Sequence, residues 1–462
     1  MIDFVLRSYT LVISRLAGRI FTGENARPLR DRLLKAATGT FGLRLAASGF
    51  SFISSVLLAR LLGVAGYGSY SYVMAWVALL AVPGLFGLDR LLVREISVYR
   101  TQSEWHLLRG LLLWANRTAL TISLGLALLA AGVIWMLAER LGFQMATTLW
   151  LGLFILPLLT LLDLRQAAMQ GLNHVVVALL PDLLLRPMSL MIFLGVAYFL
   201  LGHGLNAQWA VGLNATALAV ALLVGTVLLR RILPQPTRDV SPAYRVGVWT
   251  RSALPMMLIS GMHVINHRID TLMLGFMKGT EAVGIYTVAD RGAQLILVIQ
   301  TAVNVVLAPT IAGLHAAGKM ERLQRVITKS SRGVLLVSLS IALGLILFGE
   351  RFLSMFGAEF VDAYPTLAIL IAGCVVNTAA GAVGLLLMMT GHERDAARGV
   401  GIGVVLSMAL NAALIPKWGV EGAATATSFS MMARNLLMVL IVYSKLGIHS
   451  TAFGGFSVRR KG

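Results

Sequence analysis

The sequence predicts an all-α polytopic membrane protein whose twelve transmembrane helices form two six-helix lobes around a central cationic cavity. Three observations support this fold class: the apolar composition, the distribution of lysine and arginine, and an internal repeat. Hydrophobic residues make up 58% of the 462 residues, and charged residues only 13%. A water-soluble chain of this length could not bury so much apolar surface, because much of any soluble protein faces water.

Twelve windows of predominantly apolar residues are long enough to cross a hydrocarbon core of about 30 Å as helices. They cover residues 38–62, 68–88, 110–137, 147–166, 187–203, 209–230, 252–274, 284–308, 333–350, 365–390, 398–415 and 422–444. The fifth and ninth windows are short, and we expect the segment around Pro181 to extend the fifth one inward.

Basic residues are strongly biased toward one side of this topology. With both termini in the cytoplasm, 29 of the 39 lysines and arginines fall in cytoplasmic segments, 5 lie at the outer face and 5 lie within spans. This asymmetry is the positive-inside pattern, and a wrong number of spans would scramble it. The sequence therefore predicts a multi-pass protein with cytoplasmic termini.

Two similar motifs indicate that the chain is a tandem repeat. "LLGVAGYGSYSYV" (61–73) and "MLGFMKGTEAVGIYTVA" (273–289) both end one span with Leu-Gly and open the next with Gly-x-Tyr. Close to half the chain separates Tyr70 from Tyr286. Two parallel repeats predict two lobes with a cavity between them, although short outer loops also favour glycine and tyrosine on their own.

The predicted organisation has five parts. They are a basic amphipathic cytoplasmic segment (1–36), an N-lobe with helices one to six (37–230), a cytoplasmic linker (231–251), a C-lobe with helices seven to twelve (252–444), and a basic cytoplasmic tail (445–462).

Several function classes are disfavoured by the sequence. The net charge of +19 follows the membrane topology, so we expect no nucleic-acid partner. The single cysteine, Cys374, excludes disulfides and a cysteine-based metal site. No nucleotide-binding or Asp-x-Asp signature occurs. We therefore expect a transporter with no catalytic residue, no bound metal and no cofactor.

Arginines within the spans form the first group of candidate site residues. An ionisable side chain in a span costs at least about 2.5–3.5 kcal/mol on insertion scales and usually faces a cavity. Arg44 and Arg117 lie roughly 10 Å from the inner ends of their spans, and Arg434 lies near the middle of the last span. Arg44 also begins a stripe at helical spacing, which continues through Ser48, Ser51 and Ser55. We expect this stripe to line the cavity, although small residues alone would also fit a helix-packing seam.

A second group of ionisable residues lies in the C-terminal half, in and beside "SGMHVINHRID" (260–270). It comprises His263, His267, Arg268, Asp270, Asp290 and Arg291. Two interpretations stay open. The charges form ion pairs that hold helices seven and eight together, or they form a gate that relays protons, because His263, His267 and Asp270 share one helix face. As a metal site this set is weak, because two histidines and one aspartate occur and nothing in the sequence fixes a fourth ligand.

The excess of arginine over carboxylate within the spans favours an anionic ligand. A guanidinium group stays charged in a low-dielectric cavity and binds phosphate oxygens bidentately. A cation exporter would need the opposite balance. The sequence therefore predicts that Arg44, Arg117 and Arg434, with Ser48, Ser51 and Ser55, line a site for a phosphate-bearing ligand.

Four stretches of the chain resemble polysaccharide-biosynthesis flippases of the O-antigen translocase type. They are "LLARLLGVAGYGSYSYVMAW" (57–76), "RIDTLMLGFMKGTEAVGIYTVADR" (268–291), "MMTGHERDAARG" (388–399) and "WGVEGAATATSFSMM" (418–432). The resemblance implies the fold of the multidrug/oligosaccharidyl-lipid/polysaccharide exporter superfamily, described as MATE-like. It also implies that lumen cations bind the diphosphate, and Arg44 and Arg291 lie where such residues are expected.

The resemblance further implies what the protein transports. The expected substrate is an undecaprenyl-diphosphate-linked oligosaccharide, flipped from the cytoplasmic to the periplasmic leaflet of a bacterial inner membrane. The product would serve lipopolysaccharide O-antigen or exopolysaccharide assembly, with membrane lipids and the polysaccharide polymerase and export machinery as partners. Transport would use alternating access, with H⁺ or Na⁺ as the candidate coupling ion.

Three alternative functions fit the sequence less well. A cation-coupled multidrug exporter of the same fold is disfavoured by the arginine excess. A flippase for a peptidoglycan precursor usually has more helices than twelve. A polytopic glycosyltransferase or ligase would need catalytic carboxylates and a large outer loop, whereas the acidic loop 350–365 is better explained by interfacial aromatic anchors.

Overall fold

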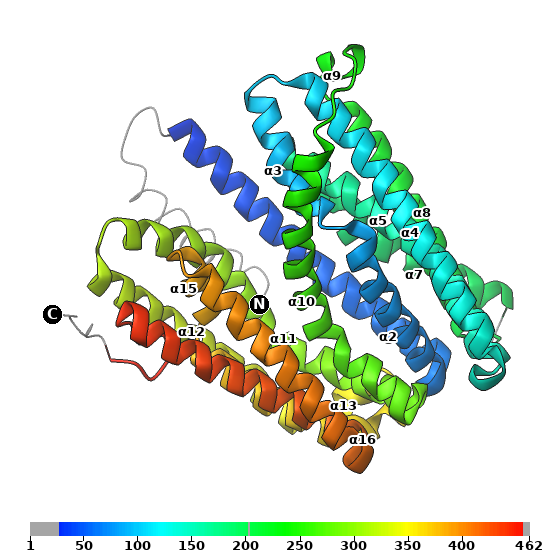
Figure 1. Cartoon of the computed structure of the whole chain (residues 1–462). Coiled ribbons are helices and arrows are strands. Elements are labelled where there is room, and N and C mark those ends of the chain that lie inside the picture. Colours follow the sequence, from blue (N-terminus) through cyan, green and yellow to red (C-terminus); the bar gives the residue numbers. More distant parts are fainter. Residues whose placement is uncertain (1–26, 202–203, 456–462) are drawn as a thin grey trace. The chain divides into compact units, whose positions relative to one another are not determined.

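The computed structural model describes residues 27–201 and 204–455, and this part of the chain is helical with no strand (Figure 1). Nine of its helices are long and apolar enough to cross a membrane. Residues 1–26, which make up most of the predicted amphipathic N-terminal segment, lie outside the described residues.

Two of the long helices each contain two spans that meet at a glycine kink. α2 (Arg27–Leu85) bends at Gly63, where φ is 66°, and α16 (Glu393–Leu446) bends at Gly419, where φ is 56°. Only glycine adopts such positive φ values without a steric penalty. α10 (Val246–Lys278) is not among the nine helices, because charged residues lower its hydropathy, but its 33 residues extend about 50 Å. With α2 and α16 each counted twice, the twelve predicted spans are all accounted for.

The remaining helices follow the predicted order. They are α3 (Leu88–Thr101), α4 (Trp105–Leu141), α5 (Phe143–Gly171), α6 (Val175–Leu180), the π-helix η2 (Pro181–Leu185), α7 (Arg186–Leu201), α8 (Ala207–Ile232), α9 (Pro236–Asp239), α11 (Thr280–Ala316), α12 (Met320–Leu347), α13 (Gly349–Ser354), the 3-10 helix η3 (Ala358–Ala363), α14 (Tyr364–Ala380) and α15 (Val383–Met389). The inward extension of the fifth span is confirmed, because α6, η2 and α7 continue through Pro181.

The chain divides into two compact units whose boundaries lie inside helices. One unit contains residues 1–58 and 77–260, and the other contains residues 59–76 and 261–462. The middle of α2 thus belongs to the same unit as the C-terminal half of the sequence. The predicted lobe boundaries at the 231–251 linker stay a prediction.

The first unit has an apolar core between α3, α4, α5 and the beginning of α10. Trp249, which is fully buried, donates a hydrogen bond from Nε1 to the hydroxyl of Tyr99 at 2.9 Å and packs against Trp114. Gly110 allows the backbone of Ala243 to approach, because a Cβ at Gly110 would lie 1.8 Å from the Ala243 carbonyl oxygen. These contacts fix the predicted cytoplasmic linker against α3 and α4.

In the second unit the two repeat motifs pack against each other. A Cβ on Gly68 would lie 1.7 Å from the carbonyl oxygen of Thr280, and a Cβ on Gly284 would lie 2.3 Å from that of Val64. Val64 and Gly68 occupy the same positions in the first motif as Thr280 and Gly284 do in the second. The two contacts are therefore reciprocal, as across a local two-fold axis. We call this contact the glycine crossing.

Backbone conformation supports the repeat independently. Gly63 (φ 66°, ψ −177°) and Gly279 (φ 87°, ψ 177°), which occupy equivalent positions in the two motifs, have nearly the same dihedral angles. Gly63 precedes the second half of α2 and Gly279 precedes α11, and each lies five residues before the glycine of its Gly-x-Tyr motif. The repeat therefore extends to the local geometry of the turn between spans.

The chain after α16 returns along α12. Gln324 donates from Nε2 to the carbonyl oxygen of His449 at 2.8 Å, and its Oε1 accepts from the His449 amide at 2.8 Å. Ser331 donates to the carbonyl oxygen of Ser450 at 3.1 Å. Residues 447–455 are thus attached to the bundle, whereas residues 456–462 of the predicted basic tail lie outside the described residues.

Candidate functional site

Asp270 lies at the centre of a buried polar cluster in the second unit. Its side chain is 5% exposed. Oδ1 accepts from Asn411 Nδ2 at 2.6 Å and from the Ser407 hydroxyl at 3.2 Å, and Oδ2 accepts from the Tyr286 hydroxyl at 3.2 Å. The Tyr286 hydroxyl also lies 3.0 Å from Thr427 Oγ1. We call these five residues the Asp270 cluster.

Three helices contribute to the Asp270 cluster. Asp270 comes from α10 and Tyr286 from α11. Ser407 and Asn411 share one face of α16 before its Gly419 kink, and Thr427 follows that kink. Because of the kink, α16 contributes side chains to the cluster from both of its halves, namely Ser407 and Asn411 from the first half and Thr427 from the second.

The Asp270 cluster combines groups that can bind a proton or a small cation. Its donors are all neutral, and a buried ionised carboxylate needs a compensating positive charge or must take up a proton. Asn411 Oδ1 is buried and accepts no hydrogen bond from any residue that the structure describes. Carboxylate, hydroxyl and amide oxygens are the ligands that hard cations prefer. Among the described residues, no three His, Cys, Asp or Glu side chains form a metal-binding group.

The predicted gate residues do not share one environment. His263, His267 and Arg268 are exposed, whereas Asp270 on the same helix is buried. Asp290 accepts from Gln294 Nε2 at 2.6 Å. In the described part of the chain, no ion pair within 4.0 Å joins Arg268 to Asp270 or Asp290, whereas Asp290 interacts electrostatically with both Arg268 and Arg291. Both interpretations of this group therefore stay predictions.

Arg291 and Arg434 are half-buried in the second unit. The Arg291 side chain lies within hydrogen-bonding reach of Tyr67, which belongs to the first repeat motif. The stem of Arg434 packs on Gly403, where a Cβ would lie 2.9 Å from Arg434 Cδ. Its guanidinium donates from Nη1 to Asn266 Oδ1 at 3.4 Å.

Arg44 and Arg117 belong to the first unit and are both exposed. No ion pair within 4.0 Å involves either arginine in the described ranges. Of the serine stripe, Ser48 donates to the carbonyl oxygen of Arg44 at 2.9 Å. Ser51 is half-buried, and Ser55 is buried and donates to the Ser51 carbonyl oxygen at 2.9 Å. The hydroxyls of Ser48 and Ser55 thus donate to carbonyl oxygens of their own helix. The site roles of these residues stay predictions.

Sequence reasoning missed four members of the Asp270 cluster as site residues, namely Tyr286, Ser407, Asn411 and Thr427. One sequence feature could have indicated this cluster, because Ser407 and Asn411 are polar residues one helical turn apart in an otherwise apolar span. It also missed a cavity of about 400 Å³ in the first unit, whose polar lining includes Asp89, Asp163 and Gln166.

Comparison with known proteins decides the family. The family described as "Polysaccharide biosynthesis protein" matches residues 33–315. The chain belongs to this family. It is 25% identical over 414 residues to the probable flippase AglR of Haloferax volcanii, covering 88% of this chain and 83% of that protein.

Solved structures show the same fold. A multidrug resistance MATE family transporter of the MOP superfamily, in an inward-facing conformation, has a TM-score of 0.70 at 13% identity and covers 88% of this chain and 98% of its own. The lipid II flippase MurJ, in an inward closed conformation, has a TM-score of 0.66 at 13% identity, with 87% and 86% covered. The predictions of a MATE-like fold and of a multi-pass membrane protein are confirmed. The name of the relative AglR, a probable flippase, agrees with the prediction of a transporter rather than an enzyme.

Proposed function

We propose that this member of the polysaccharide biosynthesis family flips an undecaprenyl-diphosphate-linked oligosaccharide from the cytoplasmic to the periplasmic leaflet of a bacterial inner membrane. The product serves assembly of a cell-surface polysaccharide such as O-antigen or exopolysaccharide, together with polymerase and export machinery. Relatives named as flippases support the lipid-linked class of substrate.

The observation that carries the proposal is the exposure of Arg44 and Arg117 at span depth without an ion-pair partner in the described chain. An arginine facing hydrocarbon costs at least about 2.5–3.5 kcal/mol on insertion scales, so these side chains face a polar space. A diphosphate offers the charge and the paired oxygens that two guanidinium groups bind. Arg291 and Arg434 add positive charge in the second unit.

Alternating access would be gated at the glycine crossing. The contact joins the predicted outer ends of spans one and two to those of spans seven and eight, and two reciprocal backbone approaches leave no room for solvent between them. The outer side opens when the crossing separates. The polyprenyl tail stays in lipid while the diphosphate and sugar move through the polar interior.

Ion coupling is assigned to the Asp270 cluster. Binding of H⁺ or Na⁺ would neutralise Asp270 and fix the relative positions of α10, α11 and α16, so the ion can bias one conformation over another. The exposed His263 and His267 are further candidates for the proton pathway. His267 interacts electrostatically with Arg268, which in turn interacts with Asp290.

Ligand-dependent melting of the purified protein tests the substrate class. Undecaprenyl diphosphate at 100 times its dissociation constant should stabilise the protein by about 2.7 kcal/mol, which a melting curve resolves. Arg44→Ala and Arg117→Ala should each lose most of this stabilisation. Arg140→Ala, which removes an exposed arginine at the predicted outer end of α4, is the matched control and should keep it.

Other outcomes would redirect the assignment. Stabilisation by cationic drugs but not by the diphosphate lipid would overturn the proposal in favour of a multidrug exporter. Stabilisation by the lipid that persists in both arginine variants would retain the substrate and remove Arg44 and Arg117 from its site.

A further inference from the structure

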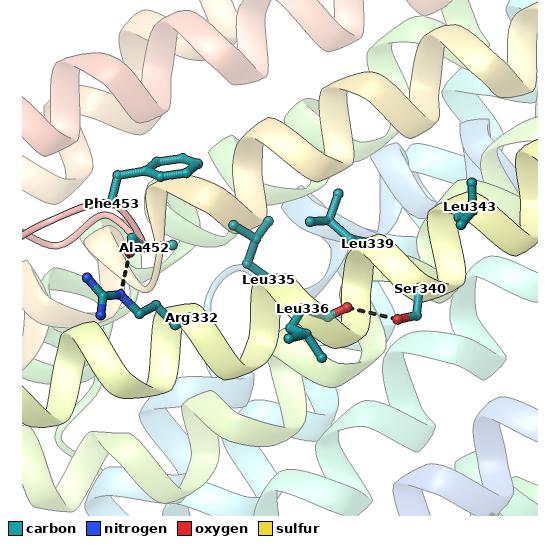
Figure 2. Close-up of a pocket in the computed structure, with 8 residues that line it drawn as sticks. All are labelled: Arg332, Leu335, Leu336, Leu339, Ser340, Leu343, Ala452 and Phe453. Carbon is teal, nitrogen blue, oxygen red and sulfur yellow. Dashed lines mark hydrogen bonds between the residues drawn. The ribbon is translucent and has the colours of Figure 1, made fainter.

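A groove of about 660 Å³ runs along the exposed face of α12. Leu336, Leu339 and Leu343 line its length, and Figure 2 shows Arg332 and Leu343 at opposite ends of this row, with Phe453 across from it. The helix rises about 16 Å from Arg332 to Leu343. The volume lies within the range of about 300–1,000 Å³ that is typical of ligand pockets.

The wall of the groove is built by the chain that returns along α12. Arg332 donates from Nε to the carbonyl oxygen of Ala452 at 2.9 Å and from Nη2 to that of Gly454 at 3.2 Å. These bonds hold Ala452, which is buried, and leave the Phe453 ring 81% exposed beside the leucines. A membrane helix always shows apolar side chains to lipid, but this helix has a fixed second wall that makes a concave surface.

A row of bases continues the groove beyond its polar end. Arg322, Arg325, Lys329 and Arg332 follow the alternating three- and four-residue spacing of one helix face, and Leu336, Leu339 and Leu343 continue it. All seven side chains are exposed. One face of α12 is therefore basic in its first half and apolar in its second half, which matches the order of headgroup and hydrocarbon along a membrane normal.

We propose that this groove binds an anionic phospholipid. The phosphate group lies among Arg325, Lys329 and Arg332, and one acyl chain lies along the leucines against Phe453. Clusters of lysine and arginine next to a membrane span attract anionic headgroups, and basic pockets at the surface of a bundle hold them specifically. The choice of an anionic over a zwitterionic lipid follows from the excess of positive charge, because α12 carries four exposed bases on this face against one acidic side chain, Glu321, in its first turn.

Lipid titration of the purified protein in detergent tests the site. Melting temperature is followed against added phosphatidylglycerol and against phosphatidylcholine with the same acyl chains. The double variant Arg325→Gln/Lys329→Gln should weaken apparent phosphatidylglycerol affinity on the order of 10- to 30-fold, because each base near the membrane surface contributes a factor of about five. The control Arg394→Gln/Lys445→Gln removes two exposed bases of α16 and should bind as the wild type does.

The apolar half of the groove is tested separately. Leu339→Trp fills the groove and should weaken phosphatidylglycerol binding, whereas Leu347→Trp changes an exposed leucine of α12 outside the groove and should not. Equal binding of both lipids by the wild-type protein, or no effect of Leu339→Trp, would overturn the proposal. Saturable binding that requires removal of residues 456–462 would assign the groove to the chain's own end and would also overturn it.

Discussion

Replacing Gly68 by alanine adds one methyl group at the glycine crossing. The new Cβ would lie 1.7 Å from the carbonyl oxygen of Thr280 and 2.9 Å from the amide nitrogen of Gly284. Real Cβ atoms do not approach closer than 3.0 Å, so the two backbones must separate by at least about 1.3 Å. Overpacking of this kind typically costs about 1–3 kcal/mol. If the crossing is the outer gate, its closed state loses a factor of about 5 to 150 in population relative to the open state.

Cross-linking measures this population directly. Val64→Cys and Thr280→Cys, in a background in which the single Cys374 is replaced by serine, place one thiol on each side of the crossing. The rate of cross-linking in membranes should fall at least about five-fold in Gly68→Ala and, by the reciprocal contact, in Gly284→Ala.

Gly313→Ala provides the matched control for this experiment. Gly313 lies on α11, as Gly284 does, and a Cβ there would meet nothing within 4 Å. The gain in helix propensity is the same in both variants. Equal cross-linking rates in Gly68→Ala and Gly313→Ala would refute the reasoning, because the added methyl group would then have been accommodated without separating the helices.

Three other predictions concern the remaining sites. Asp270→Asn should abolish any stabilisation of the purified protein by Na⁺ or by acid. The measurement is the shift in melting temperature as Na⁺ is increased at constant ionic strength, and as the pH is lowered. An unchanged response in the variant would remove Asp270 from the coupling site. Trp249→Phe should lower the free energy of unfolding by about 0.5–1.5 kcal/mol through loss of its hydrogen bond to Tyr99, and a double-mutant cycle with Tyr99→Phe should show coupling of similar size. Burial raises the pKa of Tyr99, so this region should keep its stability through neutral pH and lose it only above about pH 10, where the unfolded tyrosine ionises first. Gly403→Val should displace the stem of Arg434 and weaken binding of undecaprenyl diphosphate in the melting assay, as Arg434→Ala does; full binding by Gly403→Val would show that Arg434 does not hold the phosphate.

The spans and their order could be predicted from the sequence because each span is a local property of one continuous apolar stretch. The repeat was also visible, since Gly-x-Tyr recurs after a Leu-Gly in both halves. The sequence did not show that the two copies of the motif face each other, because nothing local records which carbonyl oxygen a glycine approaches.

The Asp270 cluster was only partly predictable for the same reason. Asp270 stood out as a charge in a span, but its partners Ser407 and Asn411 lie on a helix far later in the chain. Polar side chains of this size are common in membrane helices as packing residues. Only the tertiary structure distinguishes those that bond to Asp270 from those, like Ser55, that bond to their own helix.

The placement of residues 59–76 has a practical consequence for dissecting the protein. These residues lie within the first repeat of the sequence but pack with residues 261–462, and the beginning of α10 packs with the first unit. A fragment that ends in the 231–251 linker would carry the 59–76 hairpin without the glycines and carbonyl groups it fits. The complementary fragment would expose Thr280 and Gly284 with nothing to cover them. Neither half of the gene therefore encodes a self-sufficient folding module, and the two halves should be recovered as stable proteins only when they are produced together.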